Sequence, residues 1–386
     1  MTTCAVIILA AGAGQRFGGS LPKQYYKIGD KCILNYTFEK FIDSKFIDYI
    51  QPVINKNDNE IYDKKVSQNV KDKLLKPIYG GKRRQDSVRF ALEKLKVQNP
   101  TWVLIHDAVR PLVSTKLINN IVQKLNEEKI GIIPILPIFD SIKKIDKLNN
   151  KQISVPRENL FTVQTPQGFD YKQITKLQNK YIKNNVTDDA SLYELENIPL
   201  SFIDGDKDNI KITTKEDFLM VSNIMLETKT GIGFDVHKFT SGNEITLGGI
   251  KIPFHKSLEG HSDADVILHS ITDSLLGALG ENDIGYHFPD TDIKNLNKES
   301  KLFLMNANNK LKERNGKIIH SDINIICEEP KISPYRNKIV ESISNILKIN
   351  KTRINIKATT TEGLGFTGRK EGIACQAVTT IKIPNN

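Results

Sequence analysis

Histidines and aspartates gather in one part of the chain, in a pattern typical of a metal site. Five of the seven histidines lie between residues 237 and 287, among many aspartates. Asp235 and His237 are two residues apart in an expected strand, so their side chains point to the same face. His269 lies on the helix expected next. Isolated histidines are more often core or surface residues, but two imidazoles and a carboxylate suit Zn²⁺ and leave one position for a substrate oxygen.

A glycine-rich segment directly follows the first apolar run, from Leu9 to Gly18. Glycines allow tight turns that direct backbone N–H groups at phosphate oxygens. No Gly-Lys-Ser/Thr closes the segment, and Phe17 stands where a dinucleotide fingerprint needs a small residue. Arg16 and Lys23 are two cations suited to binding a triphosphate and neutralising charge on phosphorus under attack. At this point they can equally be solvated loop cations.

The elements expected around the glycine-rich segment alternate between strand and helix up to about residue 225. Such alternation predicts an α/β fold with a doubly wound, mostly parallel sheet. We expect strands at 6–9, 47–54, 102–105, 130–136 and 200–203, and helices near 32–43, 58–70, 86–96, 115–126 and 171–184.

A charged stretch, Asp140–Gln152, breaks this rhythm and carries an Asn-Asn turn signal, which predicts a protruding hairpin arm. Such arms often exchange with a partner subunit. Residues 214–227 predict a last amphipathic helix, and Glu227–Thr230 a short polar hinge. We therefore expect two domains, 1–227 and 228–386.

The second domain has a different pattern of elements, which predicts a smaller α+β fold. No internal repeat relates it to the first domain. We expect strands near 231–238, 245–253, 318–327, 353–360 and 373–382, and helices near 263–279, 298–314 and 334–347.

The bulk properties narrow the class of protein. The formal net charge is +10, but the lysines are spread along the chain, which favours phosphorylated small substrates over nucleic acid. No apolar run approaches the roughly 18 residues that cross a membrane. The four cysteines are scattered without a C-x-x-C pair, as in reduced cytosolic proteins, so we expect a cytoplasmic protein.

The motifs of the first domain occur in an order that resembles the 2-C-methyl-D-erythritol 4-phosphate cytidylyltransferase family. They are the glycine-rich segment with Pro22-Lys23-Gln24, Gly80-Gly81 with Ser87, His106–Pro111, Thr165-Pro166-Gln167, Thr187-Asp188 and Asp208–Lys211.

This resemblance implies roles for individual residues of the first domain. Arg16, Lys23 and Lys211 would stabilise the transition state. Gly12, Gly14, Gly81 and Ser87 would contact the nucleotide, Asp107 would hold Mg²⁺ or the ribose, and Arg110, Arg157, Thr165 and Lys211 would surround the methylerythritol phosphate, with Arg157 supplied by a second subunit's arm.

The implied reaction is in-line attack of the substrate phosphate on the α-phosphorus of CTP, without a protein nucleophile. Two positions depart from the family pattern. Lys82 stands where relatives commonly have an acid, and Ser141 where a Thr is usual. Neither belongs to the residues that the mechanism needs.

The second domain resembles the 2-C-methyl-D-erythritol 2,4-cyclodiphosphate synthase family through His261–Asp265, Asp283–Gly285, Phe288–Asp292, Pro330-Lys331 and Lys357–Arg369. The resemblance implies Zn²⁺ on Asp235, His237 and His269, with His261 and Thr360 supporting the transition state. Glu362 would hold a second divalent ion, here taken as Mg²⁺, and Ser262, Asp283, Gly285, Phe288, Asp290, Asp292, Thr359, Phe366 and Arg369 would bind substrate. Asp273, one helical turn after His269, either orients that ring or is a plain surface acid.

The two resemblances together imply a homo-oligomer, because the first family is dimeric and the second trimeric; both could combine in a hexamer. Gln376 replaces a Glu common near the three-fold axis. The two resemblances place the chain in the methylerythritol phosphate pathway to isoprenoid precursors. In that pathway an ATP-dependent kinase acts between the two implied reactions, and no kinase-type glycine-rich motif is present in this sequence. Association with that separate kinase is a hypothesis motivated by this gap.

Two alternatives remain open from the sequence. The first domain could be a sugar-phosphate nucleotidyltransferase, which shares the glycine loop and a following cation. Alternatively, one half could be inactive and serve only as a scaffold for assembly.

Overall fold

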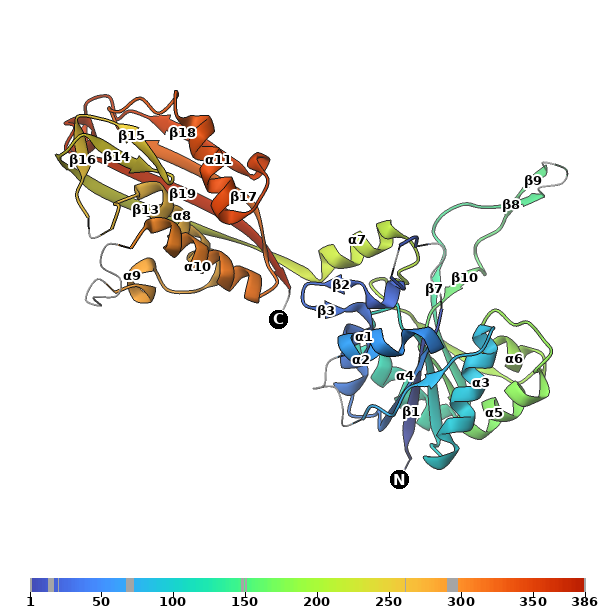
Figure 1. Ribbon diagram of the computed structural model, residues 1–386. Helices are drawn as coiled ribbons and strands as arrows, with labels where there is room; N and C mark the ends of the chain where they lie inside the picture. Colours follow the sequence, from blue (N-terminus) through green and yellow to red (C-terminus); the bar gives the residue numbers. More distant parts are fainter. Residues whose placement is uncertain are drawn as a thin grey trace. The chain divides into compact units, whose positions relative to one another are not determined.

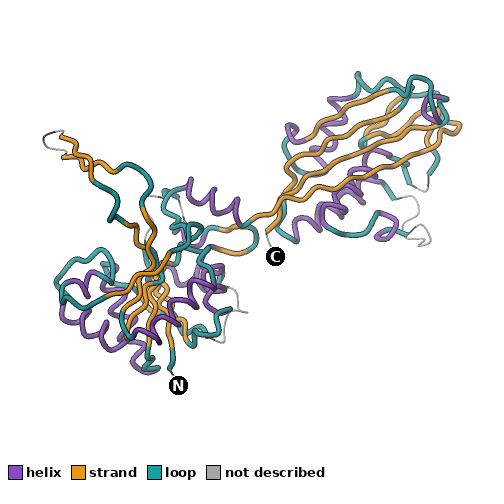
Figure 2. Tube along the Cα trace, turned by 180° about the vertical axis from the view of Figure 1, so that it is seen from behind, coloured by secondary structure: helices purple, strands orange, loops and turns teal. Residues whose placement is uncertain are grey.

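The protein folds into two compact units, Met1–Asn223 and Ile224–Asn386. The computed structural model describes residues 2–12, 17–19, 21–66, 73–146, 149, 151–260, 262–289 and 298–384. Each unit has its own sheet and its own apolar core, as Figures 1 and 2 show.

The first unit is built on an eight-stranded sheet with β1 near its centre, flanked by parallel β4 and β6. The order is β10-β7-β11-β6-β1-β4-β5, and β12 pairs with β7. Antiparallel β11 separates β6 from β7, so the sheet is mostly parallel, as predicted. The strands are β1 (Cys4–Ala10), β4 (Tyr49–Ile54), β5 (Ile78–Tyr79), β6 (Trp102–Asp107), β7 (Gly131–Pro137), β10 (Phe161–Val163), β11 (Gln167–Asp170) and β12 (Leu200–Asp204).

Helices cover both faces of this sheet, which explains why its central strands are mostly apolar. In β1, Val6 and Ile8 join one core cluster, whereas Ala5 and Ile7 join the other. The first cluster includes α1 (Ile33–Ile42), α2 (Asn59–Lys65) and α4 (Thr115–Glu128), and the second α3 (Arg84–Lys94), α5 (Tyr171–Lys180) and α6 (Ser191–Glu194). A small hairpin of β2 (Lys27–Ile28) and β3 (Lys31–Cys32) follows a 3-10 turn at Lys23–Tyr25.

The predicted arm is present as an antiparallel hairpin of β8 (Ile142–Asp146) and β9 (Lys151–Val155). It projects from the sheet in Figure 1. Its apolar side chains have no core of their own, because Ile145 is 59% and Ile153 63% exposed. A two-stranded ribbon of this kind is marginal alone, which favours contact with another surface.

The polar hinge predicted at Glu227–Thr230 is wrong. Helix α7 (Lys215–Ile224) ends just before it, and the segment belongs to one long strand, β13 (Leu226–Ser241). β13 pairs with β19 (Gly372–Pro384), from Leu226 opposite Pro384 to Lys238 opposite Gly372. A paired antiparallel strand can expose polar side chains to water, so polarity alone did not distinguish this segment from a linker.

The second unit contains a five-stranded sheet in the order β16-β13-β19-β17-β18. Its single apolar core includes residues of α8, α10 and α11. One predicted strand, 245–253, is instead the hairpin β14–β15, because Gly248 and Gly249 turn the chain with φ of +62° and +78°. The new elements are β14 (Glu244–Leu247), β15 (Ile250–Pro253), β16 (Lys256–Leu258), β17 (Lys317–Ile326), β18 (Ile354–Thr359), α8 (Val266–Leu279), α9 (Ile284–His287), α10 (Ser300–Glu313), α11 (Arg336–Leu347) and α12 (Gly365–Gly368).

Two glycines let α8 approach β13 unusually closely. A Cβ atom on Gly231 would lie 2.2 Å from the Ser274 carbonyl oxygen, and one on Gly233 2.0 Å from that of Ser270. Any larger residue would push the helix away. The strand and helix that carry the predicted metal ligands are thereby held together.

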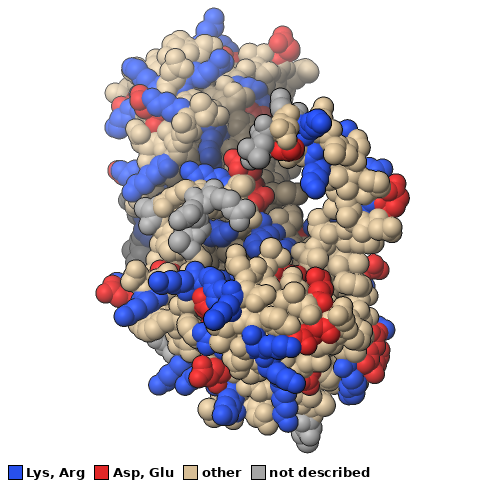
Figure 3. Space-filling view, turned by 90° about the vertical axis from the view of Figure 1, so that its right-hand side faces the viewer, with Lys and Arg blue, Asp and Glu red and all other residues tan. Residues whose placement is uncertain are grey.

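The dispersion of charged side chains and the free state of the cysteines agree with the expectations from the sequence. On the face drawn in Figure 3, Lys and Arg are dispersed among acidic and uncharged residues. All four cysteines are buried free thiols. None of the helices in the described ranges has the length and apolar character that crossing a membrane requires.

Candidate functional sites

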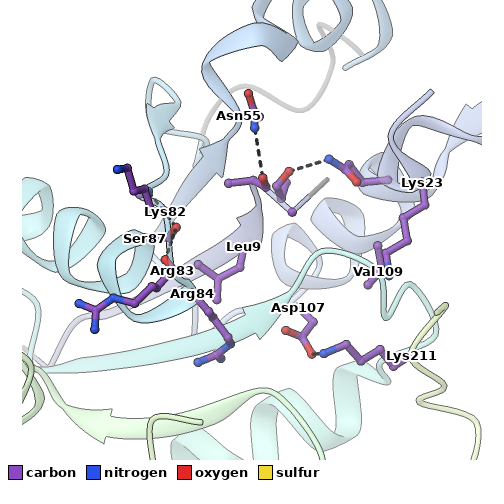
Figure 4. A pocket seen from close by; sticks show the side chains of 15 residues that line it. Leu9, Lys23, Asn55, Lys82, Arg83, Arg84, Ser87, Asp107, Val109 and Lys211 are labelled. Carbon is purple, nitrogen blue, oxygen red and sulfur yellow. Dashed lines mark hydrogen bonds and ion pairs between the residues drawn. The ribbon is translucent and has the colours of Figure 1, made fainter. Parts of the chain in front are cut away.

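A cleft of about 610 Å³ opens at the carboxyl ends of β1, β4 and β6 in the first unit. This edge is where open α/β sheets bind ligands, and the volume suits a nucleotide-sized molecule. Figure 4 shows side chains entering it from several elements. The lining consists of Leu9–Gly12, Lys23, Gln24, Asn55, Gly81–Arg84, Ser87, Asp107, Val109 and Lys211.

The cleft's charge is organised around Asp107 at the end of β6. Its Oδ2 lies 2.9 Å from Lys211 Nζ and 3.4 Å from Arg110 Nε. Burial raises the pKa of this carboxyl, but the charges of Lys211 and Arg84 outweigh burial, and the pKa lies well below its usual value. Asp107 is therefore an anion that holds cations in place before any substrate arrives.

The buried ring of His106 forms hydrogen bonds with two residues near Asp107, at the Arg110 backbone and the Thr165 side chain. His106 is 0% exposed, and burial lowers its pKa to about 3, so the ring is neutral. Its Nε2 lies 3.3 Å from the Arg110 carbonyl oxygen, which can only accept, so Nε2 carries the hydrogen. Nδ1 then accepts from the Thr165 hydroxyl at 3.0 Å, and that hydroxyl oxygen accepts from the Asp107 N–H at 3.1 Å.

Other contacts shape the part of the cleft near Lys23, Gly81 and Ser87. The Gly81 N–H donates to Ser87 Oγ at 3.0 Å, which closes the turn before α3. Lys23 Nζ donates to the Ile212 carbonyl at 2.8 Å. The two ends of the first unit's sequence thus meet at the cleft.

Sequence reasoning missed Arg84, which lines the same cleft. Its guanidinium pairs with Asp189 at 2.7 Å, and Asp189 is 0% exposed. Burial opposes the charge on Arg84, but Asp189 and Asp107 raise its pKa. The signal available was its position, between the Gly80-Gly81 turn and Ser87.

The structure brings most of the predicted residues of the first unit together. Gly12, Lys23, Gly81, Ser87, Asp107 and Lys211 line the cleft, with Arg110 and Thr165 bonded to Asp107. Arg157 does not line it: the residue lies at the foot of the arm, hydrogen-bonded to the Phe139 carbonyl. Gly14 and Arg16 lie outside the described residues.

In the second unit, Asp235 and His237 on β13 meet His269 on α8. Asp235 Oδ2 lies 3.0 Å from both His237 Nε2 and His269 Nδ1, and the two nitrogens are 3.2 Å apart. Ligands at 2.0–2.1 Å in a tetrahedral zinc site are separated by roughly 3.3 Å. The donor set and its spacing therefore fit a tetrahedral metal ion without rearrangement.

The two imidazoles also turn the correct nitrogens toward one another. His237 Nδ1 lies 2.9 Å from the Glu259 carbonyl and must donate to it, which leaves the Nε2 lone pair for a metal. Burial opposes protonation of His237, but Asp235 raises its pKa overall. Burial likewise raises the pKa of Asp235, yet its contacts with the His237 and His269 rings bring the pKa below its usual value.

The other predicted residues of this unit lie in two further segments. Thr360 donates to Glu362 at 2.9 Å in an exposed loop after β18, and Glu328 accepts from the Thr361 and Gly363 backbone. Within the described chain, no hydrogen bond or ion pair joins residues 359–369 to the metal-binding triad. In the same loop region Thr359 ends β18, Phe366 is 38% exposed and Arg369 pairs with Glu371.

The segment after α8 contains the remaining positions. Asp283 caps α9 by accepting from the Tyr286 N–H at 2.8 Å, Gly285 lies in α9, and Phe288 packs on Phe303. Asp273 accepts from the Ile284 N–H at 2.8 Å. It thereby holds the start of α9, and within the described residues no hydrogen bond joins Asp273 to His269. His261, Asp290 and Asp292 lie outside the described residues.

Comparisons with known proteins match each half of the chain to a family. The 2-C-methyl-D-erythritol 4-phosphate cytidylyltransferase family model matches residues 4–227, and the YgbB family model matches residues 228–382. A curated "Bifunctional enzyme IspD/IspF" from Paramagnetospirillum magneticum is 40% identical and covers 100% of both chains. The chain belongs to the bifunctional IspD/IspF family. A second relative of the same description, from Wolbachia pipientis wMel, is 41% identical over 97% of this chain and 95% of the relative.

A solved structure supports the first unit separately. The 4-diphosphocytidyl-2C-methyl-D-erythritolsynthase from Anaerococcus prevotii is 30% identical, with a TM-score of 0.51. It covers 58% of this chain and 96% of its own. The sugar-phosphate nucleotidyltransferase alternative is therefore excluded by the family that the first unit matches.

Membership of the IspD/IspF family establishes the two activities. The enzyme acts in the methylerythritol phosphate pathway to isoprenoid precursors. It transfers CMP from CTP to 2-C-methyl-D-erythritol 4-phosphate, releasing pyrophosphate. It also cyclises 4-CDP-methylerythritol 2-phosphate to the 2,4-cyclodiphosphate, releasing CMP.

Proposed function

We propose that the cleft of the first unit performs the cytidylyl transfer and that Asp235, His237 and His269 form the metal centre of the cyclisation. The observation that carries this assignment is the separation of two charged clusters, one in each unit. Each cluster has the chemistry that one of the two reactions needs.

In the first unit, catalysis rests on positioning and charge. A phosphate oxygen of the substrate attacks the α-phosphorus of CTP, the bond to the β-phosphate breaks, and pyrophosphate leaves. Lys23 and Lys211, with Arg16 of the glycine-rich segment, neutralise the charge that develops. Gly12, Gly14, Gly81 and Ser87 bind the nucleotide. The support for Lys23 and Lys211 is that both line the cleft.

Three side chains bind the methylerythritol phosphate beside the nucleotide: Arg110, Thr165 and Lys211. Before substrate binds, His106 holds the Thr165 hydroxyl, and Asp107 with the Asn209 carbonyl holds the Arg110 guanidinium. Asp107 holds Mg²⁺ together with the triphosphate, since magnesium sites commonly combine one or two carboxylates with substrate phosphates. Bound there, Mg²⁺ would neutralise phosphate charge.

In the second unit, the triad holds Zn²⁺, which its donor set and spacing fit. Bound zinc would polarise a phosphate oxygen and leave the fourth position to substrate. The 2-phosphate attacks the β-phosphorus of the CDP group, and CMP leaves with the bridging oxygen. His261 and Thr360 assist the transition state, and Glu362 holds a second divalent ion, Mg²⁺.

Substrate is held by two segments of the second unit. Ser262, Asp283, Gly285, Phe288, Asp290 and Asp292 bind the methylerythritol portion, and Thr359, Phe366 and Arg369 bind the nucleotide. We propose that residues 359–369 act on a neighbouring subunit's triad in a trimer. Their exposure and lack of bonds to their own triad support this arrangement.

We also propose that the first units pair through the arm, which brings Arg157 to the partner's cleft, and that dimers and trimers combine in a hexamer. The exposed apolar side chains of the arm support pairing. The catalytic domains that we propose, 1–227 and 228–386, divide the chain four residues after the boundary between the two units. The buried free thiols support a cytoplasmic location.

A phosphorus NMR time course tests the assignment. The chain is mixed with methylerythritol phosphate, CTP, Mg²⁺ and Zn²⁺, and ATP with a stand-alone pathway kinase is added later. We expect pyrophosphate first, then CMP with the cyclic diphosphate. His237→Ala should keep pyrophosphate release and stop CMP release. Lys211→Ala should stop pyrophosphate release, and CMP should then be released only when 4-CDP-methylerythritol 2-phosphate is supplied directly. Loss of pyrophosphate release in His237→Ala, or no CMP from the supplied substrate in Lys211→Ala, would contradict separate sites.

A further inference from the structure

On the side facing away from the triad, the His269 ring is contacted by Ser300, which has no assigned role and is itself held by Asp263. Its Nε2 lies 2.8 Å from Ser300 Oγ, at the first residue of α10. Ser300 is 0% exposed, and its hydroxyl also contacts Asp263 Oδ1. The same carboxylate oxygen accepts from the Ser300 N–H at 3.1 Å.

The hydrogen bonds of this network favour one tautomer of His269. A carboxylate only accepts, so the single hydroxyl hydrogen of Ser300 goes to Asp263. Ser300 Oγ must therefore accept from His269, and Nε2 carries the ring hydrogen. In the neutral ring that a bound metal requires, Nδ1 then keeps its lone pair, and Nδ1 is the nitrogen that lies 3.0 Å from Asp235 Oδ2 in the triad.

We propose that Ser300 and Asp263 are positioning residues for the metal centre: they hold His269 in the tautomer and orientation that present Nδ1 to the metal. The inference rests on the zinc site proposed above. Metal-bound histidines commonly donate their second N–H to such a partner, which orients the ring and raises its basicity as a ligand.

The surrounding loop supports a dedicated arrangement. Ala264, between Asp263 and Asp265, has a φ of +51°, a left-handed conformation that is unfavourable for a non-glycine residue. Asp265 caps α8 through Ile267 N and Leu268 N, both at 3.1 Å. The strained turn thus directs one aspartate to the helix that carries His269 and the other to Ser300.

Ser262 is a weaker partner of the same nitrogen. Its hydroxyl lies 3.4 Å from His269 Nε2, whereas the Ser300 hydroxyl lies 2.8 Å away. Ser262 Oγ also accepts from the Ala264 N–H at 3.2 Å. The shorter contact and the carboxylate behind it make Ser300 the main acceptor.

The test measures zinc affinity of the full chain by competition with a chromophoric chelator. Ser300→Ala and Asp263→Asn should each weaken zinc binding about 10- to 100-fold. Ser300→Thr, which keeps the hydroxyl, should bind within about threefold of the original chain. Ser274→Ala is the matched control, because Ser274 is equally buried on α8 but bonds Ile271 and Thr379.

Cobalt substitution adds a readout that a purely structural role would not change. The visible absorption of the Co²⁺-loaded chain should shift in Ser300→Ala and Asp263→Asn, but not in Ser300→Thr or Ser274→Ala. Unchanged zinc affinity and an unchanged Co²⁺ spectrum in Ser300→Ala would overturn the positioning role of Ser300 and Asp263, but not the metal centre. An equal loss of zinc affinity in Ser274→Ala would do the same. If Ser300→Ala does not fold, Asp263→Asn decides by the same criteria. An original chain that binds no zinc would instead overturn the metal centre itself.

Discussion

The two sites differ in where their positive charge comes from. In the first unit, Lys23, Arg84 and Lys211 line the cleft, and Asp107 orders part of this set. In the second unit, the triad consists of one carboxylate and two imidazoles, and no Lys or Arg of the described ranges is bonded to it. The first site carries its own cations, whereas the second is built to accept one.

This difference matches the two reactions. Cytidylyl transfer brings a triphosphate and a phosphate together, so fixed cations on several elements can hold both. Cyclisation must fold one substrate back on itself, and a metal ion can contact both reacting groups as a template. The sharpest tests of the comparison remove one source of charge and follow both activities.

Asp235→Asn should produce the largest effect. It removes the only carboxylate of the triad, and because a Lewis acid supplies several kcal/mol, we expect cyclisation to fall about 1,000-fold or more. Cytidylyl transfer should remain unchanged. CMP release and pyrophosphate release are measured separately, each with its own substrate. A similar fall in pyrophosphate release would contradict the view that the two sites use separate sources of positive charge.

Lys211→Ala should lower cytidylyl transfer by about 100- to 1,000-fold, since it removes one cation from the developing charge. Cyclisation should not change. Lys215→Ala is the matched control, an exposed lysine four residues on, in the first turn of α7. Equal losses in the two variants would show that general positive charge, rather than the cleft, is responsible.

Arg157→Ala should lower cytidylyl transfer about 100-fold if the arm positions substrate in a partner's cleft. Co-expression of this chain with the Lys211→Ala chain provides the decisive measurement. Mixed dimers then contain one cleft with both residues intact, so about a quarter of the original activity should return. Activity no higher than that of either parent would contradict the exchange of Arg157 between subunits.

His106→Gln should have the smallest effect, visible as a change in pH dependence. The folded-state pKa of His106 is about 3, below the usual 6.5, so the neutral ring stabilises the fold fully above pH 6.5. That contribution is lost as pH falls from 6.5 toward 3, by about 2 kcal/mol at pH 5. The stability difference between original and variant should narrow by this amount from pH 8 to pH 5.

Denaturant unfolding followed by tryptophan fluorescence measures this difference for the first unit alone. The single tryptophan, Trp102, is buried in β6 of that unit. A stability difference that is constant with pH would show that His106 does not titrate as a buried neutral ring.

The sequence predicted elements best where one pattern had one physical meaning. Strand β1 is apolar throughout and β6 is apolar as far as Ile105 because both faces of the sheet are covered, and such runs have few other uses. Glu227–Thr230 was misjudged because polar residues occur in linkers and in exposed ladders alike. Its partner strand, at residues 380–383, lies about 150 residues away along the chain.

Candidate site residues were predictable where a motif names them, and less so where support is distant. Asp235, His237 and His269 stand out by residue type, and the structure brings them together. Arg84 and Ser300 did not, because their partners Asp189 and His269 are far away in sequence. Asp273 was considered for its helical spacing to His269, but its carboxylate caps another segment.

Selective removal of zinc tests the central claim most directly. The protein is treated with a zinc-selective chelator in excess Mg²⁺, and phosphorus NMR follows each reaction with its own substrate. The charge difference between the sites predicts that pyrophosphate release continues while CMP release stops, and that added Zn²⁺ restores it. Continued cyclisation without zinc, or the loss of both releases together, would contradict the account.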